Sequence, residues 1–238
     1  MSAKADDITV DIVLPVYNEE RDLETSVNTL LSFLVQKCPH RWRIVIADNA
    51  SVDSTQDIAI RLASENPQVT YLHLDQKGRG RALRRAWLDS EADIVSYMDV
   101  DLSTDLEAFP ALIDGVAKEG YHVAIGSRLK GGAKVERQLK REIISRCYNL
   151  LIKLLFGNRF SDAQCGFKAL TREAVQDLVP IVKDQGWFFD TELLLRAEQK
   201  GYQICEIPVA WVDDPDSRVN IAQTAWGDLK GLFRVRFS

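Results

Sequence analysis

Short apolar runs rich in β-branched residues alternate with segments of helical periodicity through the first half of this chain. The apolar runs cover residues 8–16, 42–47, 69–74, 92–98 and 123–126. Between the first two runs, apolar side chains recur every three or four positions, as at Leu23, Val27, Leu30 and Leu34. Strands that alternate with helices favour a parallel sheet with helices on both faces. The pattern predicts an α/β fold in which a mostly parallel sheet is flanked by helices.

The size of the chain, 238 residues, is enough for one α/β domain with a full core, and we expect a single domain over residues 1–238. The net charge of −5 argues against nucleic acid as a partner. The four cysteines are scattered and form no Cys-x-x-Cys pair, which favours free thiols in a reducing compartment. No secretory signal opens the chain, and no apolar run reaches about 18 residues, so no membrane-spanning helix is expected.

Two carboxylates stand where the fourth apolar run ends. Residues 92–98 are followed by Asp99-Val100-Asp101, and in an extended backbone residues two apart point to the same face. We therefore expect Asp99 and Asp101 to lie side by side while Val100 points away. Two like charges on one face repel unless a cation lies between them, and the carboxyl ends of strands are where open α/β sheets bind ligands. The pair indicates a metal site, although a solvated strand exit would show the same short motif.

The loops after the other apolar runs carry no dinucleotide signature. No Gly-x-Gly-x-x-Gly follows the first run, which excludes a dinucleotide-binding protein of the Rossmann type. No Walker lysine loop occurs, which excludes a P-loop protein. Residues 77–80, Lys-Gly-Arg-Gly, precede a helix expected over residues 81–89, so their backbone N–H groups and the helix dipole would support a phosphate. A plain tight turn is the alternative. Further along, residues 128–138 read as a loose loop and residues 204–212 as one strand.

The segment from residue 130 to residue 159 is strongly basic. Its basic residues are Lys130, Lys134, Arg137, Lys140, Arg141, Arg146, Lys153 and Arg159. Eight basic residues against two acidic ones give a charge of +6, whereas the remaining chain carries −11. Apolar residues recur at helical spacing between Ile143 and Phe156, and a basic amphipathic helix can lie in a membrane interface. We expect residues 130–160 to form a basic loop and such a helix; a core helix with solvated basic residues is the alternative. Residues 229–238 read as the start of a C-terminal extension.

Five motifs occur in order along the chain. They are residues 11–20 (Asp-Ile-Val-Leu-Pro-Val-Tyr-Asn-Glu-Glu), Asp48 with residues 51–55 (Ser-Val-Asp-Ser-Thr), residues 77–80, residues 99–101 and residues 126–128 (Gly-Ser-Arg). In this order they resemble the inverting family 2 glycosyltransferases of the GT-A fold, and specifically the polyprenyl-phosphate sugar synthases. Residues 162–168 and 187–193 are similar to segments of the dolichyl-phosphate β-glucosyltransferases. The resemblance covers the chain from Ile8 to about Asp228.

The resemblance implies a role for each matching residue. Asp99 and Asp101 would hold Mg²⁺ or Mn²⁺ against the donor diphosphate. Ser103 stands at a position where some mannose synthases have a longer side chain that also binds the metal, so the identity of a third protein ligand stays open. The residues expected around the nucleotide sugar are Pro15, Tyr17, Glu19, Asp48, Lys77, Gly78, Asp99 and Gln164. Those expected at the acceptor phosphate or lipid are Arg128, Lys140, Arg141 and Arg218. The expected catalytic residues are Asp99, Asp101, Asp162 and Arg128, with Asp190 and Glu192 facing the acceptor or the sugar.

The implied activity is the inverting transfer of glucose from UDP-glucose to a polyprenyl phosphate of the dolichyl type, which gives a β-linked product. A phosphate monoester has a second pKa of about 6, so it is already nucleophilic at neutral pH and needs no strong general base. The implied partners are the nucleotide sugar, the lipid phosphate and the cytoplasmic face of a membrane, to which the protein would bind peripherally. A GDP-mannose-dependent synthase is the first alternative. A nucleotidyltransferase and a non-catalytic binder of nucleotide or lipid are the others.

Overall fold

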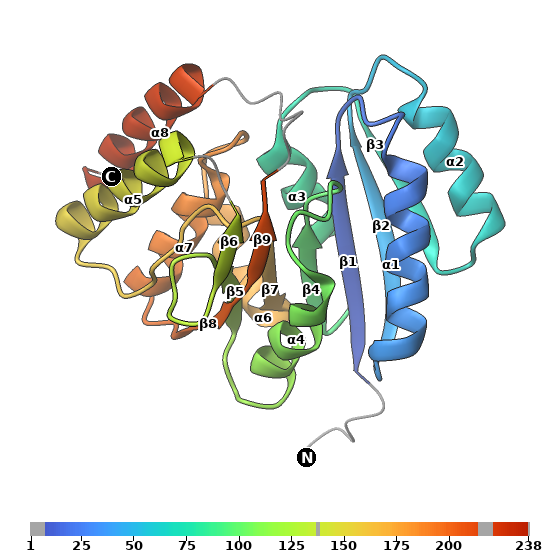
Figure 1. The fold of residues 1–238 in the computed structure, drawn as a ribbon, viewed down its shortest axis with the longest axis horizontal. Coiled ribbons are helices and arrows are strands. Elements are labelled where there is room, and N and C mark those ends of the chain that lie inside the picture. The colour runs from blue at the N-terminus through green and yellow to red at the C-terminus, as the bar shows by residue number, and fades with distance from the viewer. Residues whose placement is uncertain (1–7, 137–138, 214–220, 238) are drawn as a thin grey trace.

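The structure, a computed structural model, describes residues 8–136, 139–213 and 221–237. Seven strands form the main sheet in the order β3-β2-β1-β4-β7-β5-β8, and β6 and β9 form a second sheet (Figure 1). The strands are β1 (Thr9–Val16), β2 (Arg41–Asn49), β3 (Val69–Leu74), β4 (Ile94–Met98), β5 (Val123–Ser127), β6 (Lys134–Glu136), β7 (Phe167–Thr171), β8 (Ile204–Pro208) and β9 (Ala210–Val212). Only β7 runs antiparallel to its neighbours in the described main sheet. The predicted α/β fold with a mostly parallel sheet is confirmed.

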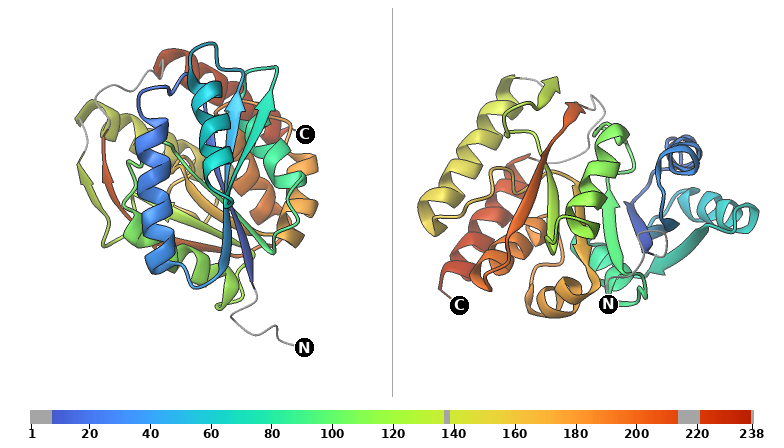
Figure 2. Two further views of the ribbon diagram at one scale, coloured as in Figure 1. Left: turned by 90° about the vertical axis from the view of Figure 1, so that its right-hand side faces the viewer. Right: turned by 90° about the horizontal axis from the view of Figure 1, so that it is seen from below.

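Helices cover both faces of the main sheet (Figure 2). They are α1 (Leu23–Lys37), α2 (Thr55–Glu65), α3 (Arg79–Leu88), α4 (Phe109–Ala117), α5 (Leu139–Phe156), α6 (Arg172–Leu178), α7 (Phe189–Gln199) and α8 (Ile221–Arg236), with 3₁₀ turns η2 (Leu106–Ala108) and η3 (Val179–Ile181). One core contains α1, α2 and α4, and the other contains α3, α6 and α7. In β1, Ile12 and Leu14 join the first core while Val13 joins the second. Burial on both faces explains why the apolar runs are continuous.

The apolar run at residues 204–212 forms two strands, so the prediction of one strand is wrong. β8 pairs with β5 in the main sheet, whereas β9 pairs with β6 and places Trp211 opposite Val135. Proline lacks a backbone N–H donor, and Pro208 marks the end of β8. The expected loose loop at residues 128–138 contains β6, so that prediction is also wrong in part. The Val212 N–H donates to the carbonyl oxygen of Ser103, which ties β9 to the loop after β4.

Helices α5 and α8 lie side by side at the end of the molecule remote from β3 (Figure 1). In α5, Ile143, Leu150 and Leu154 are 53%, 58% and 76% exposed. The amphipathic helix expected within residues 130–160 is therefore present, and this exposure disfavours an ordinary core helix. Residues 229–236 belong to α8, which presents further exposed apolar side chains. Within the described residues, no helix has the length and apolar content needed to cross a bilayer.

Candidate active site

A cavity of about 290 Å³ lies beside the carboxyl ends of β4 and β5. Six residues that the sequence predicted for the site line it: Asp99, Asp101, Arg128, Arg141, Gln164 and Asp190. Further side chains complete the wall, among them Trp187 and Asp228. The fold therefore brings segments from α3 through to α8 to the paired aspartates.

The strand before the paired aspartates ends earlier than the sequence predicted. β4 stops at Met98, so Asp99 and Asp101 lie in a turn and the expected extended backbone is wrong. Leu102 has a φ of 49°, and its N–H donates to the carbonyl oxygen of Asp99. Both carboxylates nevertheless line the same cavity. Gly166 packs against the first of them: an added Cβ would lie 1.8 Å from Asp99 Oδ2, so a side chain at this position would displace that carboxylate.

The two carboxylates suit a hard divalent cation, since Mg²⁺ and Mn²⁺ prefer oxygen ligands. Ser103 lies beside them in the cavity wall, and its N–H donates to Asp101 Oδ1 at 2.9 Å. In the part of the chain that the structure describes, no three His, Cys, Asp or Glu side chains converge as a metal-binding group. Asp99 and Asp101 would hold such a cation, and a bound diphosphate and water would supply further oxygen ligands.

Arg79, which the sequence analysis did not single out, links the Asp99 turn to α7. Its Nη2 lies 2.5 Å from Asp99 Oδ1, and its Nη1 lies 2.6 Å from Asp190 Oδ2. The side chain is only 11% exposed. The one signal in the sequence was its place directly after Gly78 in the phosphate-type loop. Its partner Asp190 is 111 residues away along the chain, and local pattern does not reveal such a contact.

Asp190 is held in a buried polar cluster. The Tyr97 hydroxyl donates to Asp190 Oδ1 at 2.5 Å, and Lys168 Nζ lies 3.2 Å from the same oxygen. Lys168 is fully buried. Burial would raise the pKa of Asp190, but the charges of Lys168 and Arg79 and the Tyr97 hydrogen bond outweigh it and lower that pKa. Asp190 is therefore an ionised anchor that fixes Arg79 at the cavity.

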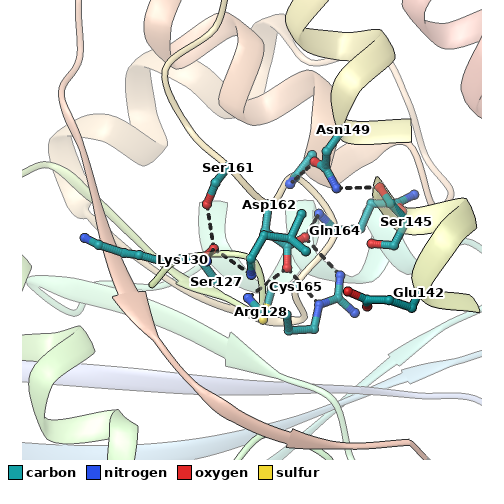
Figure 3. A network of polar contacts seen from close by, with 12 residues as sticks. Ser127, Arg128, Lys130, Glu142, Ser145, Asn149, Ser161, Asp162, Gln164 and Cys165 are labelled. Carbon is teal, nitrogen blue, oxygen red and sulfur yellow. Dashed lines mark hydrogen bonds and ion pairs between the residues drawn. The ribbon is translucent and has the colours of Figure 1, made fainter. Parts of the chain in front are cut away.

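Arg128 and Asp162 form a bidentate ion pair (Figure 3). Arg128 Nε and Nη2 donate to Asp162 Oδ2 and Oδ1 at 2.7 and 2.9 Å. Asp162 is fully buried behind Arg128, whose guanidinium lines the cavity. Burial opposes ionisation of Asp162, but the charge of Arg128 outweighs it and lowers the pKa of that carboxyl to about 2. In this geometry Asp162 positions Arg128, and the planar guanidinium suits a phosphate at the cavity.

Asp48 lies at the end of β2 with no exposed surface. It accepts hydrogen bonds from the Ser51 N–H at 3.0 Å and the Tyr71 hydroxyl at 3.1 Å, and it contacts His73 Nδ1 at 2.9 Å. Burial would raise the pKa of Asp48, but the hydrogen bonds from Ser51, His73 and Tyr71 together lower it. The carboxylate is thus fixed and ionised at the strand end where the sequence predicted a nucleotide contact.

The other residues predicted for the nucleotide lie in or beside neighbouring loops. These residues are Pro15, Tyr17, Glu19, Lys77 and Gly78. Lys77 Nζ lies 3.5 Å from the centre of the Tyr17 ring, a cation–π contact. The Gly78 N–H donates to Asn49 Oδ1 at 2.6 Å, and the Glu19 N–H donates to Thr55 Oγ1 at 2.7 Å. These contacts join the loops after β1, β2 and β3 into one surface next to Asp48.

The residues predicted for the acceptor are only partly brought together. Arg141 lines the cavity and forms an ion pair with Asp213, so it does not simply face outward from α5. Lys140 belongs to α5, but its side chain lies outside the described part of the chain, as does the whole of Arg218.

Asp228 of α8 is a cavity residue that the sequence analysis missed. It is 3% exposed, and Gln164 Nε2 donates to its Oδ2 at 2.8 Å. Burial, with a further contribution from the charge of Asp184, raises its pKa from 3.8 to about 7. The residue lies near the end of the chain, among helix positions whose pattern predicts only amphipathicity.

The raised pKa of Asp228 predicts a pH-dependent effect on stability. Because the folded protein binds this proton more tightly than the unfolded chain does, Asp228 destabilises the fold progressively as the pH rises from about 4 to about 7. We expect Asp228→Asn to raise Tm by several degrees at pH 8 and to change it little at pH 4. Thermal unfolding followed by circular dichroism at both pH values measures this difference. The same Tm difference at both values would contradict it.

Comparisons with known proteins were made by sequence and by structure. The family model described as glycosyl transferase family 2 matches residues 11–179. Glycosyltransferase AglD of Haloferax volcanii is 37% identical over 95% of this chain, although the matched part is only 36% of that protein. The dolichyl-phosphate beta-glucosyltransferase of Saccharomyces cerevisiae is 30% identical over 98% of this chain and 75% of its own length.

Among solved structures, the chain resembles glucosyl-3-phosphoglycerate synthase from Mycobacterium tuberculosis in complex with UDP. The TM-score is 0.72 at 20% sequence identity, and the match covers 96% of this chain and 80% of that one. A further structure of that synthase contains Mn²⁺, UDP and glucosyl-3-phosphoglycerate, with a TM-score of 0.71 at 21% identity. At this level of identity the likeness establishes the fold, which is that of the GT-A glycosyltransferases.

Proposed function

The chain belongs to glycosyl transferase family 2, and from that premise we propose that it transfers glucose from UDP-glucose to a polyprenyl phosphate of the dolichyl type. The observation that carries the proposal is one cavity lined by both the carboxylates Asp99 and Asp101 and the guanidinium groups of Arg79 and Arg128. Transfer from a nucleoside diphosphate sugar to a phosphate requires two anionic groups to be held together. The yeast relative's name specifies glucose and dolichyl phosphate, and it supports this choice of substrates.

The acceptor chemistry determines what the chain's own residues must do. A lipid phosphate with a second pKa of about 6 is a competent nucleophile at pH 7, so no residue has to remove its proton. Arg128, held by Asp162, would orient that phosphate for in-line attack on the sugar carbon. Asp190 keeps Arg79 between the aspartate turn and α7, where it would meet the donor. A single displacement of this kind inverts an α-linked donor to a β-linked product.

Asp99 and Asp101 would hold the divalent cation, which we propose to be Mg²⁺ or Mn²⁺. When bound, the cation neutralises charge on the leaving diphosphate. The Mn²⁺ in the structurally similar synthase complex supports a divalent metal in this fold. Pro15, Tyr17, Glu19, Asp48, Lys77 and Gly78 would surround the nucleotide, because their loops adjoin the aspartate turn at the same edge of the sheet.

We also propose that α5 and α8 rest on the cytoplasmic surface of a membrane. Exposed apolar side chains on both helices face solvent, including Leu154 on α5 at 76% and Phe233 on α8 at 70%. Basic residues accompany them, with Arg146 65% exposed, and such helices bind anionic lipid surfaces. The four cysteines are free thiols, as a reducing compartment favours. This placement would bring the cavity to the lipid acceptor.

The membrane surface predicts the effect of removing apolar side chains. The double variant Leu154→Ser, Phe233→Ser should lower partition onto vesicles of phosphatidylcholine and phosphatidylserine at least about tenfold, because each buried side chain of this size contributes roughly 1.5–3 kcal/mol. Sedimentation with vesicles measures the partition. Val35→Ser on α1, which removes a side chain that is 74% exposed, is the matched control and should bind as the native protein does. Equal partition of the double variant and the control would show that α5 and α8 do not contact the membrane.

The donor is tested by transfer from two labelled nucleotide sugars. Native protein, polyprenyl phosphate in vesicles and a divalent cation are incubated with either UDP-glucose or GDP-mannose, and the lipid phase is extracted. We expect label from UDP-glucose and little from GDP-mannose. Label from GDP-mannose alone would reject the glucose assignment and leave the synthase class intact, whereas label from neither would reject the synthase.

A further inference from the structure

The C-terminal helix forms part of the cavity wall although it lies beyond the segment that the family model matches. That match ends at residue 179, yet Thr224, Ala225 and Asp228 of α8 line the cavity. The helix is fixed against the rest of the protein. Gly231 lies so close to Phe188 that an added Cβ would be 2.3 Å from its ring, and Arg234 pairs with Glu192 at 2.7 Å. The wall that α8 supplies is therefore a defined surface of the site.

Asp228 is an unusual residue to find in that wall. It is 97% buried, and the charges that act on it most, those of Asp184 and Asp190, are both negative. Its hydrogen-bonding neighbours are Gln164 from the loop before β7 and Tyr148 from α5. Burial of a carboxyl among acidic groups destabilises a fold, so a carboxyl kept at such a cost is a candidate for a ligand contact.

The chemistry around Asp228 selects the kind of ligand. A phosphate is disfavoured, because Asp184 and Asp190 repel a second anion as they repel the ionised form of Asp228. A sugar hydroxyl is favoured, because it can donate to the carboxyl oxygen while it accepts from a carboxamide. Gln164 supplies that carboxamide 2.8 Å away, and Trp187 supplies an aromatic face in the same cavity.

The pair lines the same cavity as the proposed diphosphate site. Asp99 and Asp101 line that cavity too, so a hexose attached to a diphosphate held there would occupy the space that Gln164 and Asp228 border. We propose that Asp228 and Gln164 bind hydroxyl groups of the transferred hexose and make α8 a determinant of sugar specificity. The inference rests on the proposed function, which supplies the nucleotide sugar.

The test separates the sugar from the nucleotide. Isothermal titration calorimetry in the presence of Mn²⁺ measures the Kd of UDP and of UDP-glucose for the native protein and for Asp228→Asn. For each protein, the ratio of these two Kd values gives the contribution of the glucose group to the affinity. We expect Asp228→Asn to weaken UDP-glucose about tenfold and to leave UDP unchanged, since a hydrogen bond to a charged group is lost. Asp89→Asn, a carboxyl on the surface beside Arg85, is the matched control and should keep the native ratio.

The same titration at two pH values distinguishes a contact between Asp228 and the sugar from a purely structural role, because a structural role would not change the ratio of the two Kd values with pH. An ionised carboxylate accepts hydroxyl hydrogen bonds more strongly than a neutral acid. The affinity added by glucose should therefore increase from pH 6 to pH 8 in the native protein and stay level in Asp228→Asn. The groups that face this carboxyl are Tyr148 on α5, Asp184 before α7 and Asp190 on α7. The native ratio in Asp228→Asn, or an equal loss for UDP and UDP-glucose, overturns the inference.

A different binding result would reject UDP-glucose as the donor without testing the role of Asp228. A native protein whose affinity for UDP-glucose does not exceed that for UDP, but which binds GDP-mannose more tightly than GDP, rejects glucose as the sugar. The same comparison of Asp228→Asn with GDP and GDP-mannose then decides whether α8 contacts the hexose. Thermal unfolding of the variant checks its fold, and the expected Tm at pH 8 is at or above the native value.

Discussion

An Asp99→Asn variant should lose on the order of 10³-fold in turnover while it remains folded. The amide keeps the shape of the side chain but removes the charge that would hold the cation and keep it against the leaving diphosphate, and losses of this size follow the removal of one group that stabilises developing charge. Arg79 keeps its second partner, Asp190, at 2.6 Å, so the local structure is preserved. Initial rates of glucose transfer to polyprenyl phosphate measure the effect.

The control for this prediction is Asp89→Asn, which makes the same chemical change at the exposed carboxyl of the residue that directly follows α3. It should retain native turnover, and both variants should unfold within a few degrees of the native Tm. Turnover of Asp99→Asn within tenfold of native would contradict the role given to the aspartate turn. It would also favour a site that binds nucleotide without using these carboxylates in the reaction.

Removal of the Asp162 carboxylate should produce the largest loss of stability. Asp162→Ala leaves the buried guanidinium of Arg128 without its bidentate partner, and breaking a buried ion pair costs about 3–5 kcal/mol in the free energy of unfolding. Urea denaturation at pH 7 measures that free energy. A loss of less than about 1 kcal/mol would mean that Arg128 finds another partner.

The same pair predicts how stability responds to acid. The folded-state pKa of Asp162 is about 2, below its ordinary value of 3.8. The contribution of the ionised carboxylate is therefore fully present above about pH 4 and is lost as the pH falls towards 2. The difference in unfolding free energy between native protein and Asp162→Ala should shrink over that range. A difference that stays constant from pH 6 to pH 2.5 would contradict the ion pair as its source.

The features that local pattern determines were predicted well from the sequence. Strand runs buried on both faces, and helices with one apolar side, specify a mostly parallel sheet, and this sheet was confirmed. The paired aspartates were located because they directly follow an apolar run. Their extended geometry was wrong, because β4 ends at Met98 and a left-handed Leu102 turns the chain.

The missed parts of the site depend on contacts between distant segments. β7 inserts antiparallel between β4 and β5 and carries Lys168, whose buried ammonium meets Asp190 from α7 and donates to the Cys165 carbonyl oxygen. Arg79 joins residues that are 20 and 111 positions away. No periodicity in a single sequence reports such pairings. Asp228 was missed for the same reason, since its role depends on how α8 packs.

Family membership argues against one of the three alternatives for function. A nucleotidyltransferase is disfavoured, because the match over residues 11–179 is to glycosyltransferases. The non-catalytic binder is the alternative that the Asp99→Asn experiment addresses. The mannose synthase differs from the proposed function in the donor and is addressed by the comparison of UDP-glucose with GDP-mannose.

The central claim is that a cation at Asp99 and Asp101 lets UDP leave as glucose passes to a lipid phosphate. Its most direct test is the transfer of labelled glucose from UDP-glucose to polyprenyl phosphate in vesicles by native protein stripped of metal, before and after addition of Mn²⁺ or Mg²⁺. The account predicts lipid-phase label that is near background without the cation and rises as the cation is added. Equal label with and without a chelator, or no label from UDP-glucose under any condition, would contradict it.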